Sequence, residues 1–173
     1  MTSLRAASPD QPALLDSERE RFAFWAWNDV GIFVWYAVPT RDALFRLQKV
    51  AEPRIKLYPE GLSDVHLVRG RVALPDQGTR EALVRLSSEA ADHLAAVAIV
   101  LGGQGFWAST IRSLVTGIRL LVPGRFGMTM CGSTEEVADW LPEAHAKRTG
   151  RRMNPAALKR ALDFVDRHED GPP

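Results

Sequence analysis

The feature that most constrains the fold is an uninterrupted apolar run over residues 95–101, followed by the glycine-rich stretch 102–105. A short run with no polar face is typical of a strand that is covered on both sides of a sheet. Amphipathic helical patterns lie before and after it, over residues 79–94 and 106–122. Strand and helix patterns that alternate in this way predict an α/β domain with a parallel sheet.

Four further segments have strand character. Residues 22–27 and 32–38 are rich in aromatic and β-branched side chains, and the four residues between them have turn composition, which predicts an antiparallel hairpin. Residues 65–74 and 126–131 are the other two. Because Arg69, Gly70 and Arg71 interrupt the apolar pattern of 65–74, we expect that strand at an edge or with a bulge.

Four of the predicted helices begin at a residue whose side chain can accept a hydrogen bond from the first free amides: Thr40, either Asp76 or Thr79, Ser133, and Asn154. Pro53 is expected to end or bend the first helix soon after residue 51. Ser133 and Glu136 have the spacing of a capping box, in which the glutamate carboxylate reaches back to the amide of Ser133.

The predicted fold is therefore α/β: a mixed, mostly parallel five-stranded sheet with an N-terminal β-hairpin, flanked by helices, plus an extra C-terminal helix. We expect residues 1–17 to form a flexible lead, residues 18–146 to form the α/β domain, and residues 147–173 to supply a basic linker and the last helix.

Charge and cysteine content exclude several partner classes. The 22 basic and 21 acidic residues give a net charge of +1, which provides no overall field for nucleic acid. No apolar stretch is long enough for a membrane span, and the first residues lack the apolar run of a signal peptide. The lone Cys131, in an apolar strand pattern, rules out an intramolecular disulfide. We expect a cytoplasmic protein with no nucleic-acid partner and no membrane span.

No pattern typical of catalysis or metal binding is present. The four histidines, at 66, 93, 145 and 168, include no pair at helical ligand spacing, and no G-x-S-x-G motif occurs. Gly102, Gly103 and Gly105 lie between a strand and a helix, where anions can bind, but they match no nucleotide-binding motif. We therefore predict no catalytic residue, no metal and no cofactor, and name these glycines only as a candidate ligand loop.

The C-terminal half of the chain carries a resemblance to a known family. It has the apolar strand at 95–101, a turn, a helix around 111–121, a short strand, and then the stretch Ser133-Thr-Glu-Glu-Val-Ala-Asp-Trp-Leu141. That stretch is similar to the "x-S-x-E-E-A-x-x-W-L" ending of STAS-like bacterial proteins, and the order of strands and helices over roughly residues 20–145 resembles STAS domains, which include the anti-sigma-factor antagonists.

The resemblance implies a regulatory signalling domain that binds a protein partner and is not an enzyme. In partner-switching antagonists, a kinase phosphorylates a serine or threonine at the start of the helix after the third strand. Here Thr79 is the nearest hydroxyl, within Asp76-Gln-Gly-Thr-Arg80. The family's Asp-Ser-Ser-Gly-like motif is absent, because the glycine precedes the hydroxyl, so a plain role in capping the helix stays open beside phosphorylation.

Two apolar features are candidates for an interaction surface. Trp25 and Trp27 share one face of their strand, where they either pack in the core or present an aromatic edge to a partner or a second copy of the chain. The helical pattern over 106–122 is apolar on more than one side and includes Leu120, which indicates deep burial or an interface.

Three functional hypotheses follow. The first is a non-catalytic STAS-like module that binds a protein partner, with a homodimer as one form of that binding. The second is a carrier or sensor of a small ligand or lipid, held in an apolar cavity between the sheet and helix 106–122. The third is an enzyme of unrecognised type.

Overall fold

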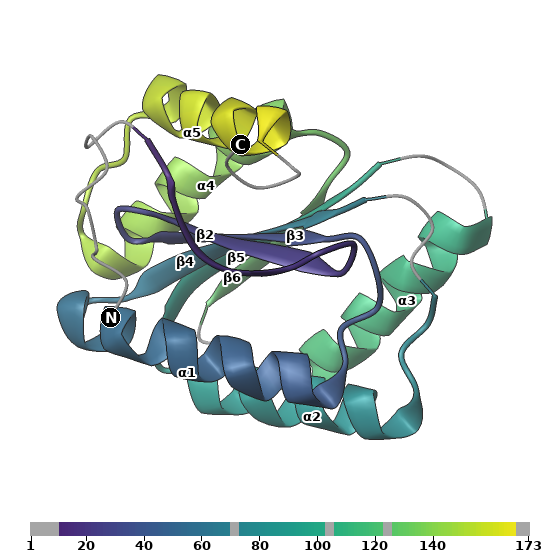
Figure 1. Cartoon of the computed structure of the whole chain (residues 1–173). Coiled ribbons are helices and arrows are strands. Elements are labelled where there is room, and N and C mark those ends of the chain that lie inside the picture. Colours follow the sequence, from purple (N-terminus) through teal and green to yellow (C-terminus); the bar gives the residue numbers. More distant parts are fainter. Residues whose placement is uncertain (1–10, 70–72, 103–105, 123–125, 169–173) are drawn as a thin grey trace.

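The structure is a computed structural model that describes residues 11–69, 73–102, 106–122 and 126–168. Within them, one sheet lies between two layers of helices: α4 and α5 cover one face, and α1, α2 and α3 cover the other (Figure 1). The strands are β1 (Ala13–Glu18), β2 (Phe22–Trp27), β3 (Val30–Trp35), β4 (Leu62–Val68), β5 (Leu94–Leu101) and β6 (Gly127–Cys131). The helices are α1 (Arg41–Leu57), α2 (Gln77–Ala90), α3 (Phe106–Leu121), α4 (Thr134–Thr149) and α5 (Pro155–Arg167).

The six strands of the described chain lie side by side in sequence order, β1-β2-β3-β4-β5-β6. β1–β2 and β2–β3 are antiparallel, whereas β3–β4, β4–β5 and β5–β6 are parallel. The α/β class and the hairpin at the start of the domain are thus confirmed. The predicted number of five strands is wrong, and parallel pairing is confined to the half of the sheet from β3 to β6.

The missed strand is β1, which occupies the end of the segment expected to be a flexible lead. Leu14 packs against the core beneath α4 and α5, and Leu15 packs against the core beneath α1 and α2. The register to β2 shifts between Leu14 and Asp16, and the second half of the strand, Asp16 to Glu18, is polar. An edge strand with two adjacent leucines and a register shift lacks the alternation that sequence reasoning relies on.

β4 also differs from its prediction. It begins earlier, at Leu62, and ends at Val68, before the Arg69-Gly70-Arg71 stretch of which residues 70 and 71 lie outside the described residues. It pairs on both sides, with β3 and β5, so the edge alternative is wrong. The pairing with β5 does shift in register, but between Leu62 and Ser63 at the start of the strand and not near Arg69. Arg69 does not interrupt a buried strand, because the strand has already ended at Val68.

The helix starts follow the sequence closely. The side chains of Thr40, Asp76 and Asn154 accept hydrogen bonds from amides of α1, α2 and α5, so of the two candidates for α2 it is Asp76 that caps. Ser133 Oγ accepts from the amide of Glu136, as predicted. The return bond differs: the Glu136 carboxylate accepts from the amide of Gly132, not of Ser133.

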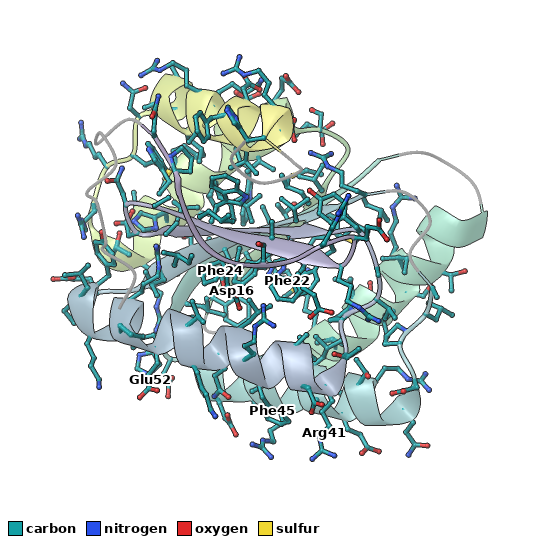
Figure 2. The ribbon with its side chains drawn as sticks, viewed as in Figure 1. Asp16, Phe22, Phe24, Arg41, Phe45 and Glu52 are labelled. Atoms are coloured by element: carbon teal, nitrogen blue, oxygen red, sulfur yellow. The ribbon has the colours of Figure 1, made fainter. Side chains whose placement is uncertain are left out.

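The first helix is longer than predicted. α1 continues through Pro53 to Leu57, because Arg54 and Ile55 beyond the proline stay half-buried and continue the packed face. Phe22 and Phe24 point from the sheet toward this helix, whereas Arg41 and Phe45 lie on its far side (Figure 2). Phe45 lies between the guanidinium groups of Arg41 and Arg85, and so joins α1 to α2.

Candidate interaction surface

β6 is an edge strand of the sheet. It pairs with β5 along one side, and within the described residues no strand pairs with its other side. Its five residues, Gly-Met-Thr-Met-Cys, include no charged side chain, and their pairing with β5 proceeds without a register shift. A regular, uncharged edge leaves backbone N–H and C=O groups free to pair with another chain.

The side chains of β6 alternate between the two helix layers. Met130 packs with Leu101 and Ile111 beneath α3, and Cys131 belongs to the core beneath α4. Met128, Thr129 and Met130 in the middle of the strand are only half-buried, so α3 and α4 leave this edge partly open. The edge is therefore accessible from outside while both of its faces are anchored.

An open groove of about 570 Å³ lies beside the amino end of β6, on the α4 side. It is lined by Ala95 and Gly127 from the sheet and by residues of one flank of α4: Trp140, Glu143, Ala144, Lys147 and Arg148. A Cβ atom at Gly127 would lie 3.4 Å from Cζ2 of Trp140, so the indole lies directly against the start of β6. Trp140 is half-buried and gives the groove an apolar floor beside exposed charges.

Two exposed leucines lie at the end of α3 from which the chain passes to β6. Leu120 is 81% exposed and Leu121 is 66% exposed. Ile111 and Val115 of the same helix pack toward the sheet, whereas Leu120 and Leu121 lie outside that packed cluster. We call the strand Gly127–Cys131, together with Leu120, Leu121, Trp140 and Lys147, the β6 edge surface.

The opposite edge of the sheet, β1, has charged side chains and an irregular register. Asp16 accepts two hydrogen bonds from Arg46 of α1, at 2.6 and 2.7 Å, and Glu18 forms an ion pair with Arg21 at 2.8 Å. The register shift near Leu14 adds an irregularity. Charged side chains and bulges on an edge strand discourage pairing with other chains. These features protect β1, and β6 lacks them.

The arrangement that most resembles a catalytic one is a buried Ser-His-Asp chain on the α4 side. Ser63 Oγ lies 2.8 Å from His145 Nδ1, and His145 Nε2 lies 3.2 Å from Asp29 Oδ2. Although burial alone raises it, the pKa of Asp29 stays below its usual value because of the His145 imidazole and the Arg151 guanidinium. Ser63 and His145 are 0% and 1% exposed, so a substrate cannot reach them. The contacts among Ser63, His145 and Asp29 instead hold α4 against the sheet.

Two titratable groups lie on the other face of β4. Burial raises the pKa of Asp64 to about 7, although the Arg54 guanidinium favours the charged form. Burial lowers the pKa of His66 to about 4, and its Nδ1 accepts a hydrogen bond from Trp35 Nε1 at 3.1 Å. His66 also stacks on Phe33 with ring centres 4.8 Å apart. Burial between the sheet and the helices therefore favours the neutral form of both the Asp64 carboxyl group and the His66 imidazole.

The two tryptophans named from the sequence are in the core. Trp25 is 3% exposed and Trp27 is 5% exposed, and both pack under the α4 and α5 layer. Trp25 makes an edge contact with Phe164 of α5, with ring centres 5.9 Å apart. Of the two interpretations, core packing fits this burial, and neither indole presents an aromatic edge to a partner.

Thr79 is the third residue of α2 and is buried. Its amide donates to Asp76 Oδ1 at 2.7 Å, and it lines a surface hollow of about 340 Å³ between the starts of α1 and α2. Asp42 and Asp76 line the same hollow and would repel an added phosphate. Phosphorylation of Thr79 stays a prediction.

Of the candidate ligand loop, only Gly102 is described. It is exposed just after β5, and a Cβ atom there would meet nothing within 4 Å. Gly103 and Gly105 lie outside the described residues. A ligand at this loop stays a prediction.

Sequence reasoning named Leu120 but missed Thr129, Trp140 and Lys147. These residues share one surface because β6 is the last strand of the sheet. The position of a strand within a sheet is a property of the tertiary structure. The available signal was the order of elements: consecutive strands usually lie beside one another, so the last strand of such a series falls at an edge.

The fold and this surface define an α/β protein with an open parallel edge. A scan against models of protein families and a search of curated proteins both give no match to the chain. In the described part of the chain, no helix has the length and apolar character of a membrane span. Likewise, no three of its His, Cys, Asp or Glu side chains are grouped so as to hold a metal ion.

Proposed function

We propose that this chain is a non-catalytic, STAS-like regulatory module that binds a protein partner through the β6 edge surface. The observation that carries the proposal is the open, uncharged edge of β6, which follows in the chain after the exposed Leu120 and Leu121 at the end of α3. Exposed apolar side chains beside free strand hydrogen-bonding groups fit a partner that adds its own strand to the sheet.

A non-catalytic role is supported by where the reactive side chains lie. Ser63 and His145 are enclosed beneath α4 and serve packing. Catalysis needs such groups within reach of a substrate in a cleft. The groove beside β6 contains Trp140, and aromatic residues are enriched in protein interfaces.

We also propose a cytoplasmic location. Cys131 is the only cysteine of the chain and is buried, with burial raising the pKa of its thiol. Such a thiol is unreactive, and a chain stabilised without disulfides suits a reducing compartment.

The test is site-specific photocrosslinking in cells with a benzoylphenylalanine residue at position 120. The matched control carries the same residue in place of Lys49, which is exposed on α1. We expect a protein adduct from position 120 and little or none from position 49. No adduct at position 120, or equal adducts at both positions, would refute binding through the β6 edge surface.

A further inference from the structure

The geometry of β6 suits pairing with an identical strand. The strand spans five residues with Thr129 at its centre, and its pairing with β5 is regular throughout. Two copies that meet antiparallel about a two-fold axis at Thr129 align all five residues of each strand. Such an axis perpendicular to the sheet keeps the α4 layer of both copies on the same face, so the two sheets become one continuous sheet.

The direction of α4 then sets which charges meet. α4 runs opposite to β6: Glu136 lies at Gly132, beyond the carboxyl end of the strand, and Trp140 and Ala144 lie at Gly127, its amino end. A two-fold axis at Thr129 therefore passes close to the level of Trp140. The end of α4 in one copy comes level with the start of α4 in the second copy.

The two ends of α4 carry opposite charge. Its first turn holds Glu135 and Glu136, and its last turn holds Lys147 and Arg148. Glu135 pairs with Lys159 of α5 at 3.0 Å and Arg148 donates to the carbonyl of Asp92, so the charges considered beside β6 are Glu136 and Lys147. Lys147 lines the groove beside β6 and is exposed, and its partner within the chain is Glu143 at 2.8 Å. An antiparallel arrangement of two such helices brings the basic end of each toward the acidic end of the other, which favours self-association over like-charge contact.

We propose that the β6 edge surface binds the same surface of a second copy of this chain, with the two β6 strands paired antiparallel about Thr129. The inference rests on the proposed function, since it names the partner of the same surface. Self-pairing uses three properties together: an uncharged regular edge, apolar side chains beside it, and a flanking helix that is complementary in charge to itself.

Disulfide trapping tests the register directly. Opposed residues of an antiparallel pair have Cα atoms roughly 4.5–5.5 Å apart, within the range of about 4.4–6.8 Å that a disulfide spans. In a Cys131→Ala background, the full chain with Thr129→Cys should form a covalent dimer under mild oxidation at micromolar concentration. Met128→Cys, displaced from the axis, should react more slowly, and Ser17→Cys on the exposed part of the β1 edge should stay monomeric.

Charge variants test the orientation of α4. By sedimentation velocity, Lys147→Gln should weaken the wild-type dimer by about threefold and Lys147→Glu by about tenfold. Lys49→Glu on α1 serves as a control of the same charge change and should leave the dimer constant unaltered. Circular dichroism and thermal melting show whether each variant keeps its fold.

The outcomes separate this inference from the proposed function. Trapping that is fastest at position 129, with a wild-type dimer by sedimentation, supports both. A monomeric wild type with no excess trapping at position 129 over position 17 overturns the second copy as partner. If crosslinking from position 120 then yields an adduct with a different protein, the proposed function stands and the inference fails; if it yields none, both fail.

Discussion

The two edges of the sheet are built on different principles. β1 is irregular and charged: Asp16 is held by Arg46, Glu18 lies beside Arg21, and the register shifts near Leu14. β6 is short, regular and without charge. Proteins commonly protect exposed edges with charges and bulges, so an edge without them invites pairing. Only the β1 edge therefore has features that discourage pairing with another chain, and the β6 edge does not.

The largest expected effect comes from placing a charge on the open edge. Thr129→Lys should weaken self-association by about a hundredfold, because a lysine in the strand pair meets its own copy across the two-fold axis. Ser17→Lys puts the same side chain on the protected edge and should leave association unaltered. Sedimentation velocity of both variants measures this, and equal effects at the two edges would erase the contrast between them.

The pH dependence of stability sharpens the comparison, because two titratable groups, Asp64 and His66, lie on β4 in the interior of the sheet, away from both edges. Asp64 has a raised pKa of about 7, so its stabilising contribution is present below about 4 and is lost as the pH rises through 7. His66 has a lowered pKa of about 4, so its contribution is present above about 6.5 and is lost as the pH falls through 4. Between about pH 4 and 6.5 the two trends oppose each other.

Replacing either Asp64 or His66 should reveal the pH dependence of stability that comes from the other. Asp64→Asn should leave a free energy of unfolding that rises by on the order of 2 kcal/mol from pH 4 to 6.5. His66→Asn should leave one that falls over the same range. Urea denaturation at several pH values checks both, and two parallel profiles would show that these groups are not held neutral. Neither variant should alter dimerisation at pH 8.

Removal of the ion pair between Arg46 and Asp16 at the β1 edge should have a smaller effect. Arg46→Ala loses the paired hydrogen bonds to Asp16 and should cost about 0.5–1 kcal/mol of stability, since the pair is partly exposed. The amides of β1 should also exchange faster with solvent. Lys49→Ala on the same helix is the control. If hydrogen exchange in β1 stays the same in Arg46→Ala, the ionic pair does not hold that edge.

The smallest effect is expected at the end of α3. Replacing Leu120 and Leu121 together with serine should weaken self-association by about threefold while stability changes by less than about 0.5 kcal/mol, because both side chains are exposed in the single chain. Chemical denaturation and sedimentation of the double variant measure the two quantities. A loss of stability larger than this would show that the leucines support the fold rather than an interface.

Local features of the fold could be predicted from the sequence, and tertiary ones could not. The caps at Thr40 and Asn154 depend on neighbouring amides and were predicted correctly. β1 was missed because its pairing with β2 decides its structure, while its own pattern is weak. Pro53 was expected to end or bend α1 close behind residue 51, but packing of the residues after it carries the helix on to Leu57.

The candidate site shows the same division. The sequence showed that the helix containing Leu120 is apolar on more than one side, because that pattern lies within a single helix. The contribution of Thr129 was not, since nothing in the Gly-Met-Thr-Met-Cys pattern says whether a strand has one neighbour or two. The burial of Trp25 likewise depends on α5, far along the chain, packing over the first hairpin.

Hydrogen–deuterium exchange measured at low and high protein concentration tests the central claim most directly. If β6 pairs with β6 of a second copy, its amides should become protected as the concentration rises, and the amides of β1 should exchange at the same rate throughout. Exchange in β6 that does not depend on concentration, or protection that develops in β1 instead, would contradict the claim that β6 is the edge built for association.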